Sequence, residues 1–204
     1  MRGKLMRAPD TIADGIDARD ARVGRVVWIT GLSGAGKSTL AEETIRLLRT
    51  RGEHVVGLDG DALREVFGAT GAENHGRAAR LALAFQYARL SRLLAMQGAT
   101  VVIATISLFR EIHVWNRLNL PGYFEVYLKV PLAELRRRDP KDIYRRFEAG
   151  LLSDVAGLDM QVDEPAEADW VVEFSPTHRP IDLATTLTRR LYERESHECT
   201  IETR

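Results

Sequence analysis

The chain has 204 residues, of which 45% are hydrophobic and 28% are charged, a composition that fits a globular protein and excludes a disordered or collagen-like chain. Its 29 Lys and Arg residues balance 29 Asp and Glu residues, and a protein without net charge has no overall field that would attract nucleic acid or an anionic membrane. Any anionic ligand must therefore be held by a local site.

The length of the chain and the character of its ends predict its organisation. We expect one domain over residues 24–195, preceded by an arm of residues 1–23 and followed by a tail of residues 196–204. No stretch has the roughly 18–20 apolar residues of a membrane span, and the charges near the N-terminus leave no apolar signal core. These features predict a cytoplasmic protein, and the single cysteine, Cys199, is interpreted as a surface thiol.

Segments with strand character alternate with segments of helical periodicity. Strands are predicted over residues 26–30, 54–58, 99–106, 124–130 and 170–174, and helices over 37–50, 81–96 and 180–193, with helical propensity over 132–150. Alternation of this kind favours a parallel sheet. The predicted fold class is α/β, with three layers in which helices cover both faces of a parallel sheet.

A glycine-rich loop joins the first predicted strand to the first predicted helix. Residues 31–38 read Gly-Leu-Ser-Gly-Ala-Gly-Lys-Ser and match the P-loop pattern G-x-x-x-x-G-K-[ST] in full. Such a loop turns its backbone N–H groups toward one anion, while Lys37 reaches the β- and γ-phosphates and Ser38 can hold Mg²⁺. The alternative interpretation is a glycine-rich turn that binds no ligand. Such a turn does not require a strand before it and a helix after it, and both are predicted here, so we predict a P-loop NTPase fold.

A P-loop of this kind occurs in switch GTPases and in kinases. A guanine-binding element of the form N/T-K-x-D is absent from the later part of the sequence. Residues 154–157 spell D-x-x-G, but they lie too far along the chain to follow the second or third strand, and we interpret this match as chance. The sequence therefore favours a kinase.

Charged residues follow the second predicted strand. Asp59, Asp61 and Arg64 stand just past its carboxyl end, which in a parallel sheet faces the ligand crevice. A carboxylate there can orient or deprotonate an acceptor hydroxyl or bind metal-coordinated water, and an arginine can bind phosphate or sulfate. A second interpretation makes Asp61 the N-cap of a helical turn that begins at Ala62.

The sequence resembles the adenylyl-sulfate (APS) kinase family, whose members use MgATP to phosphorylate the 3′-hydroxyl of APS. The resemblance covers about residues 25–175. It rests on segments that occur in the same order, namely residues 31–39, 58–61 with Arg64, 106–107, 124–127, 138–141 with Tyr144, and 157–159.

The resemblance implies roles for the matching residues. The catalytic positions are Lys37, Asp61 and Ser107, with Asp61 engaging the acceptor hydroxyl and Ser107 either hydrogen-bonding the acceptor or carrying phosphate transiently. The expected ATP-binding residues are Gly31, Ser33, Gly34, Ala35, Gly36, Lys37, Ser38, Thr39, Arg138 and Lys141. The expected acceptor-binding residues are Asp59, Asp61, Arg64, His75, Arg80, Ser107, Leu108, Phe109, Val155 and Gly157. Ser38 and Asp59 are the expected ligands of Mg²⁺, the implied cofactor.

A lid over ATP is predicted at about residues 135–160, of which residues 135–146 are rich in arginine. Arginines lie on both sides of Asp139-Pro140-Lys141, where the proline interrupts the helix and permits a hinge. Lid arginines can neutralise the phosphoryl oxygens during transfer. The alternative interpretation is a solvated basic helix.

Some positions depart from the family pattern. The family's two phenylalanines, which sandwich the acceptor adenine, are replaced by His75 and Val155, and a family asparagine is replaced by Leu83. Stacking on an aromatic ring contributes about 1–3 kcal/mol per base. Trp115 and Tyr123 lie in a stretch that resembles relatives acting on cytidine diphosphoramidate, and they are either a replacement stacking platform or packing residues.

The leading hypothesis is an ATP-dependent kinase that phosphorylates a ribose hydroxyl of APS or of a related nucleotide-linked small molecule. A cytidine diphosphoramidate kinase is the alternative among enzymes, and a nucleotide-binding regulatory protein is the alternative outside them. The expected partners are ATP and the acceptor, without nucleic acid or membrane, and a homodimer is left open.

Overall fold

The computed structural model describes residues 23–71 and 76–202, with the backbone alone described for residues 195–202. Five strands form one sheet, β1 (Val26–Thr30), β2 (Val55–Asp59), β3 (Thr100–Ala104), β4 (Phe124–Lys129) and β5 (Trp170–Glu173). Their order is β2-β3-β1-β4-β5, and every neighbouring pair is parallel. The α/β fold class and the five strand positions predicted from the sequence are confirmed.

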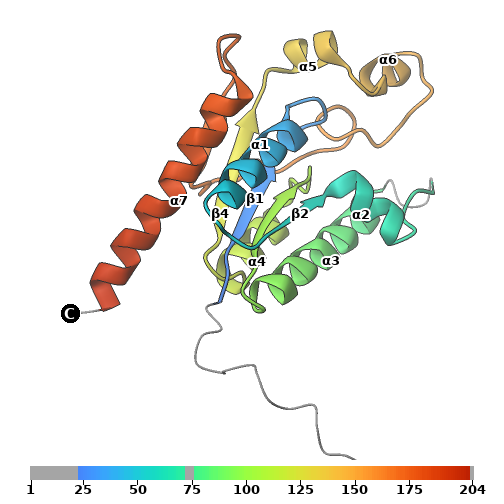
Figure 1. Cartoon of the computed structure of the whole chain (residues 1–204). Helices are drawn as coiled ribbons and strands as arrows, with labels where there is room; N and C mark the ends of the chain where they lie inside the picture. Colours follow the sequence, from blue (N-terminus) through green and yellow to red (C-terminus); the bar gives the residue numbers. More distant parts are fainter. Residues whose placement is uncertain (1–22, 72–75, 203–204) are drawn as a thin grey trace, which may run out of the picture.

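Helices cover both faces of this sheet (Figure 1). α1 (Lys37–Thr50) and α7 (Pro180–Glu202) pack on one face, and α3 (Arg77–Ala95) and α4 (Arg110–Asn119) pack on the other. The short helices α2 (Gly60–Val66), α5 (Leu132–Arg138) and α6 (Ile143–Glu148) follow β2 and β4 at the carboxyl edge of the sheet. None of the helices in the described part of the chain has the length and apolar character needed to cross a membrane.

The central strand β1 is buried on both faces. Val27 and Ile29 belong to the apolar cluster formed with α1 and α7, whereas Val26 and Trp28 belong to the cluster formed with α3 and α4. Successive side chains of a strand point to opposite faces, so a strand between two helical layers must be apolar at every position. This requirement explains the uninterrupted Val-Val-Trp-Ile run of the sequence.

Several helix boundaries differ from the sequence prediction. α3 begins at Arg77 rather than at residue 81, and α7 continues to Glu202, past the predicted end of this helix at residue 193 and into the predicted tail. The segment 132–150 forms two helices separated at Pro140, as the missing N–H and the ring of proline require. α4 was not predicted at all. Most of the predicted N-terminal arm, residues 1–22, and the Cys199 side chain lie outside the described residues.

The packing of α7 on α1 provides a test of the fold. Leu187 in α7 is fully buried, so Leu187→Ala should lower the free energy of unfolding by about 2–5 kcal/mol, since the lost methyl groups leave a cavity. Urea unfolding measures this change. The control Leu118→Ala, at a side chain that is 78% exposed, should change stability by no more than about 0.5 kcal/mol. Equal losses in the two variants would contradict the described packing.

Candidate functional site

The P-loop lies at the carboxyl edge of the sheet between β1 and α1. Gly31 has a φ of +149°, and a Cβ at this position would lie 2.7 Å from the carbonyl oxygen of Leu128. Only glycine therefore fits at this position. The N-cap of α1 is Gly36, and no side chain caps the helix. The backbone N–H groups of the first turn are therefore available to an anion.

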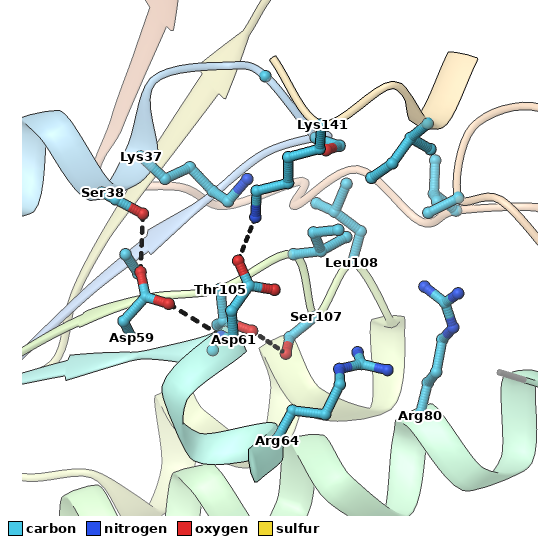
Figure 2. Close-up of a pocket in the computed structure, with 18 of the residues that line it drawn as sticks. Lys37, Ser38, Asp59, Asp61, Arg64, Arg80, Thr105, Ser107, Leu108 and Lys141 are labelled. Atoms are coloured by element: carbon cyan, nitrogen blue, oxygen red, sulfur yellow. Dashed lines mark hydrogen bonds and ion pairs between the residues drawn. The ribbon is translucent and has the colours of Figure 1, made fainter. Parts of the chain in front are cut away.

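A cavity of about 460 Å³ opens beside this loop (Figure 2). Its walls come from the P-loop, the carboxyl end of β2, α3, the segment after β3 and the lid. It gathers most of the residues predicted for the site, namely Ser33, Gly34, Gly36, Lys37, Ser38, Thr39, Asp59, Asp61, Arg64, Arg80, Ser107, Leu108, Phe109, Arg138 and Lys141. The structure therefore brings the predicted ATP side and the predicted acceptor side into one cavity.

Four other predicted site residues do not line this cavity, namely Gly31, Ala35, Val155 and Gly157. The Val155 side chain is buried, and its backbone N–H donates to Oδ1 of Asp159 at 2.6 Å. Its neighbours Ala156 and Met160 line the cavity instead. Gly157 lies against the side chain of Leu32, where a Cβ would come within 2.8 Å of a methyl group.

The positions that depart from the family pattern fall in different places. Leu83 lines the cavity, while His75 lies outside the described residues. Tyr123 is a core residue with 3% exposure, and Trp115 packs edge-to-face on Phe85 with ring centroids 6.1 Å apart. Trp115 and Tyr123 are packing residues, and they form no stacking platform at this cavity.

Asp59 connects the acceptor side to the P-loop. Its Oδ2 accepts a hydrogen bond from Ser38 Oγ at 2.7 Å, and its Oδ1 accepts one from the backbone N–H of Asp61 at 2.9 Å. Burial opposes ionisation of Asp59, yet these bonds and one from the Ala62 backbone keep its pKa below the ordinary value. Asp59 is the N-cap of α2, so the interpretation of Asp61 as a cap is wrong.

The pair formed by Ser38 and Asp59 fits a magnesium ion. Mg²⁺ usually keeps several waters and binds one or two protein oxygens together with phosphate oxygens. A hydroxyl and an ionised carboxylate 2.7 Å apart beside the P-loop supply ligands of that kind. In the described residues there is no cluster of three His, Cys, Asp or Glu side chains suited to a metal.

Charged groups of opposite sign meet over the cavity. The Asp61 carboxylate, which caps no helix, pairs with the ammonium group of Lys141 from the lid, and Figure 2 shows the Lys37 side chain pointing into the same region. Lys37 Nζ donates to the Leu32 carbonyl oxygen at 2.8 Å. Burial and the charge of Lys141 lower the pKa of Lys37 to about 8. An arriving polyphosphate would relieve this crowding of ammonium groups.

Ser107 lies at the base of the cavity with a strained backbone. Its φ is +31°, and its buried hydroxyl is 2.8 Å from the Thr105 hydroxyl. The preceding carbonyl, of Ile106, accepts a hydrogen bond from Thr30. A serine that carries phosphate needs an adjacent base, and the partner here is a second hydroxyl, so the geometry favours hydrogen bonding to the acceptor.

The lid is anchored directly on the P-loop. Tyr144 Oη donates to the Ser33 carbonyl oxygen at 2.9 Å, and Arg138 Nη1 donates to that of Gly34 at 3.4 Å. Between α5 and α6 the Asp139 carboxylate accepts from the backbone N–H groups of Tyr144 at 3.1 Å and Arg145 at 3.0 Å. The predicted break at Pro140 is therefore a turn held by Asp139, and Arg138 just before it contacts the P-loop.

A second cavity of about 240 Å³ lies on the other side of the P-loop. The Arg138 guanidinium group is 4.9 Å from the centroid of the Phe174 ring, and both residues line this cavity together with Ser175 and His178. A cation stacked on an aromatic ring presents a flat surface of the kind that a base occupies. The sequence interpretation missed Phe174, Ser175 and His178, although Phe174 ends the last predicted strand and the other two follow it, at the ligand-binding edge.

The P-loop, the carboxylate opposite it and the arginine lid together define a P-loop phosphotransferase. Its family follows from comparison with known proteins. The family model described as adenylylsulphate kinase matches residues 23–173, and the chain belongs to this family.

Individual relatives agree with this assignment. A cytidine diphosphoramidate kinase of Campylobacter jejuni is 35% identical over 150 residues, covering 74% of this chain and 86% of that protein. An adenylyl-sulfate kinase of Deinococcus deserti is 40% identical over 150 residues, covering 72% and 80%. The Mycobacterium tuberculosis APS kinase solved with AMPPNP and APS matches with a TM-score of 0.75 and 31% identity, covering 83% of this chain and 98% of that chain.

These comparisons confirm the predicted P-loop NTPase fold, the family and the kinase activity. They exclude the regulatory alternative. The cytoplasmic location and the homodimer stay predictions.

The lowered pKa of Lys37 predicts that ATP binding takes up protons. Near pH 8 about half of the Lys37 side chains are neutral in the free protein, and the phosphates of ATP favour the charged form. ATP affinity should therefore fall as the pH rises above about 8. Titration calorimetry at pH 8 in two buffers of different ionisation enthalpy should show an uptake of about half a proton.

The control for this measurement is Lys37→Arg, because arginine stays charged at this pH. The variant should show no comparable uptake. Uptake of the same size in both proteins would assign the proton to another group.

Proposed function

We propose that this kinase transfers the γ-phosphoryl group of MgATP to a ribose hydroxyl of a nucleotide acceptor. The observation that carries the proposal is the position of Asp61, whose carboxylate caps no helix and faces Lys37 and Lys141 across the cavity. Arg64 and Arg80 extend from α2 and α3 toward the same cavity (Figure 2) and supply positive charge for an anionic acceptor.

ATP would bind with its phosphates on the P-loop and its base in the second cavity, between Arg138 and the segment after β5. Mg²⁺, held by Ser38 and Asp59, would neutralise charge on the phosphate oxygens. Lys37 and Arg138 bind the phosphates from either side of the loop. This arrangement fits a loose transition state, in which positioning and charge neutralisation supply most of the catalysis.

The acceptor oxygen forms the new bond to the γ-phosphorus while the bond between that phosphorus and the β–γ bridging oxygen breaks. Asp61 orients the hydroxyl and accepts its proton. Before that step the ion pair between Lys141 and Asp61 must break. The phosphates of ATP are negatively charged and can replace Asp61 as the partner of Lys141. Ser107 donates a hydrogen bond that holds the acceptor in place.

Replacement of Asp61 by asparagine tests its role in proton transfer. Asp61→Asn should bind ATP within a few-fold of the parent affinity and lose at least about 100-fold in turnover, because the amide cannot accept the proton. ADP release coupled to an added nucleotide acceptor measures the turnover. Glu193→Gln, at an exposed ion pair on α7 that lines neither cavity, should leave turnover unchanged. Acceptor-dependent turnover near the parent level in Asp61→Asn would remove Asp61 from the mechanism.

The two candidate acceptors are APS and a cytidine nucleotide, and two observations favour the cytidine nucleotide. A relative that is 35% identical is named a cytidine diphosphoramidate kinase. The residues that replace the family's aromatic sandwich are His75 and the buried Val155, and the wall near Val155 is formed by Ala156 and Met160. An aliphatic wall gives an adenine ring less stacking than two phenylalanines would.

We therefore expect the protein to use cytidine diphosphoramidate with a higher kcat/KM than APS. The loss of about 1–3 kcal/mol of stacking per ring corresponds to a penalty of about 5- to 150-fold for each missing aromatic ring. Steady-state ADP release with each acceptor measures the ratio. More efficient phosphorylation of APS than of the cytidine nucleotide would make APS the acceptor.

A further inference from the structure

Asp163 fastens three segments of the chain to one another, although it does not line the cavity. Its Oδ2 accepts hydrogen bonds from the backbone N–H of Arg110 at 3.2 Å and from Arg77 Nη2 at 3.3 Å. Its own backbone N–H donates to the Leu108 carbonyl oxygen at 3.0 Å. Its carbonyl oxygen lies 3.0 Å from Nε2 of His113. We call this set of contacts the Asp163 clasp.

The clasp lies directly behind the acceptor side of the cavity. Leu108 and Phe109 form the wall that follows β3, and both are nearly fully buried. Met160 and Val162, from the segment that ends at Asp163, form the adjoining wall. Because the clasp joins these two backbone segments, it fixes the distance between the walls that an acceptor must fit between.

His113 anchors the clasp in the core of the protein. Its Nδ1 lies 2.7 Å from Oε1 of Glu125 in β4, and its Nε2 faces the Asp163 carbonyl. Glu125 is 2% exposed and lies 3.6 Å from Arg117. The contacts of the two ring nitrogens of His113 tie the clasp to the sheet.

We propose that Asp163 is a positioning residue that sets the shape of the acceptor wall and thereby the affinity for the base and sugar of the acceptor nucleotide. This proposal rests on the proposed function of the same cavity. The ATP side is held separately, by Tyr144, Arg138 and the P-loop backbone. Loss of the clasp should therefore change acceptor binding and leave ATP binding as it was.

Steady-state kinetics of two variants test the separation. Asp163→Ala should raise the KM for the preferred acceptor at least about fivefold, while the KM for ATP stays within twofold of the parent. Asp163→Asn keeps an oxygen that can accept from Arg110, so it should recover most of the acceptor KM. Glu193→Ala, which removes the exposed Arg189–Glu193 pair on α7, is the control and should change neither constant, because these two residues line neither cavity. Equal changes in both KM values, or an unchanged acceptor KM, would overturn the proposal.

Amide hydrogen exchange on the ligand-free protein gives a readout that does not depend on activity. Asp163→Ala should speed exchange in peptides covering residues 108–112 and 160–164 and leave β1 unchanged. Unchanged exchange in both peptides would overturn the clasp. If the parent phosphorylates neither APS nor cytidine diphosphoramidate, the proposed function fails, while the exchange rates still decide whether the clasp exists.

Discussion

The parallel pairing of β1 with both β3 and β4 is the constraint on which the rest of the structure depends. It brings the carboxyl ends of these strands to one edge, where the P-loop, Ser107 and the lid begin. β2 pairs with β3 in the same direction and delivers Asp59 to that edge. Residues from widely separated parts of the sequence therefore share one cavity because the sheet has a single direction.

The charges in this cavity are balanced in a way that suits an anionic ligand. Asp59 accepts hydrogen bonds from the Ser38 hydroxyl and from the backbone of α2. Asp61 instead forms an ion pair with Lys141, which belongs to the lid. The pKa of Lys37 is lowered partly because Lys141 is near. A triphosphate would supply negative charge to both lysines at once, so in the proposed reaction its binding would restore the charge of Lys37 and release Asp61 for the acceptor. In that proposal, Lys141 of the lid links ATP binding to the proton acceptor.

The parts of the structure that depend on local sequence could be predicted, and those that depend on distant partners could not. The P-loop requires glycines and a lysine at fixed spacing, and the buried strands require continuous apolar runs, so both can be recognised in the sequence. α4 was missed because its N-cap is Phe109, which makes no capping hydrogen bond and gives no start signal. The interpretation of Asp61 as a cap assumes that the helical turn begins at Ala62, whereas α2 begins at Gly60, which makes Asp59 the N-cap and places Asp61 in the first turn.

The cavity near Phe174, proposed for the base of ATP, and the Asp163 clasp both depend on contacts between distant parts of the sequence. Arg138 and Phe174 are far apart in the sequence, as are Asp163 and Arg77, and no periodicity connects such pairs. The contacts follow from the order of the strands, which places the segment after β5 beside the P-loop and the end of the lid segment beside α4. The sequence motifs therefore indicate phosphoryl transfer, while contacts between distant residues shape the surfaces at which we propose that the ligands bind.

This division also explains how one fold can serve different acceptors. The ATP side is built from backbone groups of the P-loop and from a lid that is tied to them by Tyr144, so most side-chain changes elsewhere leave it intact. The proposed acceptor wall is built from side chains such as Leu108 and Met160, and Asp163 joins the two backbone segments that carry them. Under the proposed function, substitutions in that wall would alter the shape available to a base without moving Lys37 or Asp61. The proposed reacting groups and the proposed acceptor wall thus lie on separately supported parts of the same cavity.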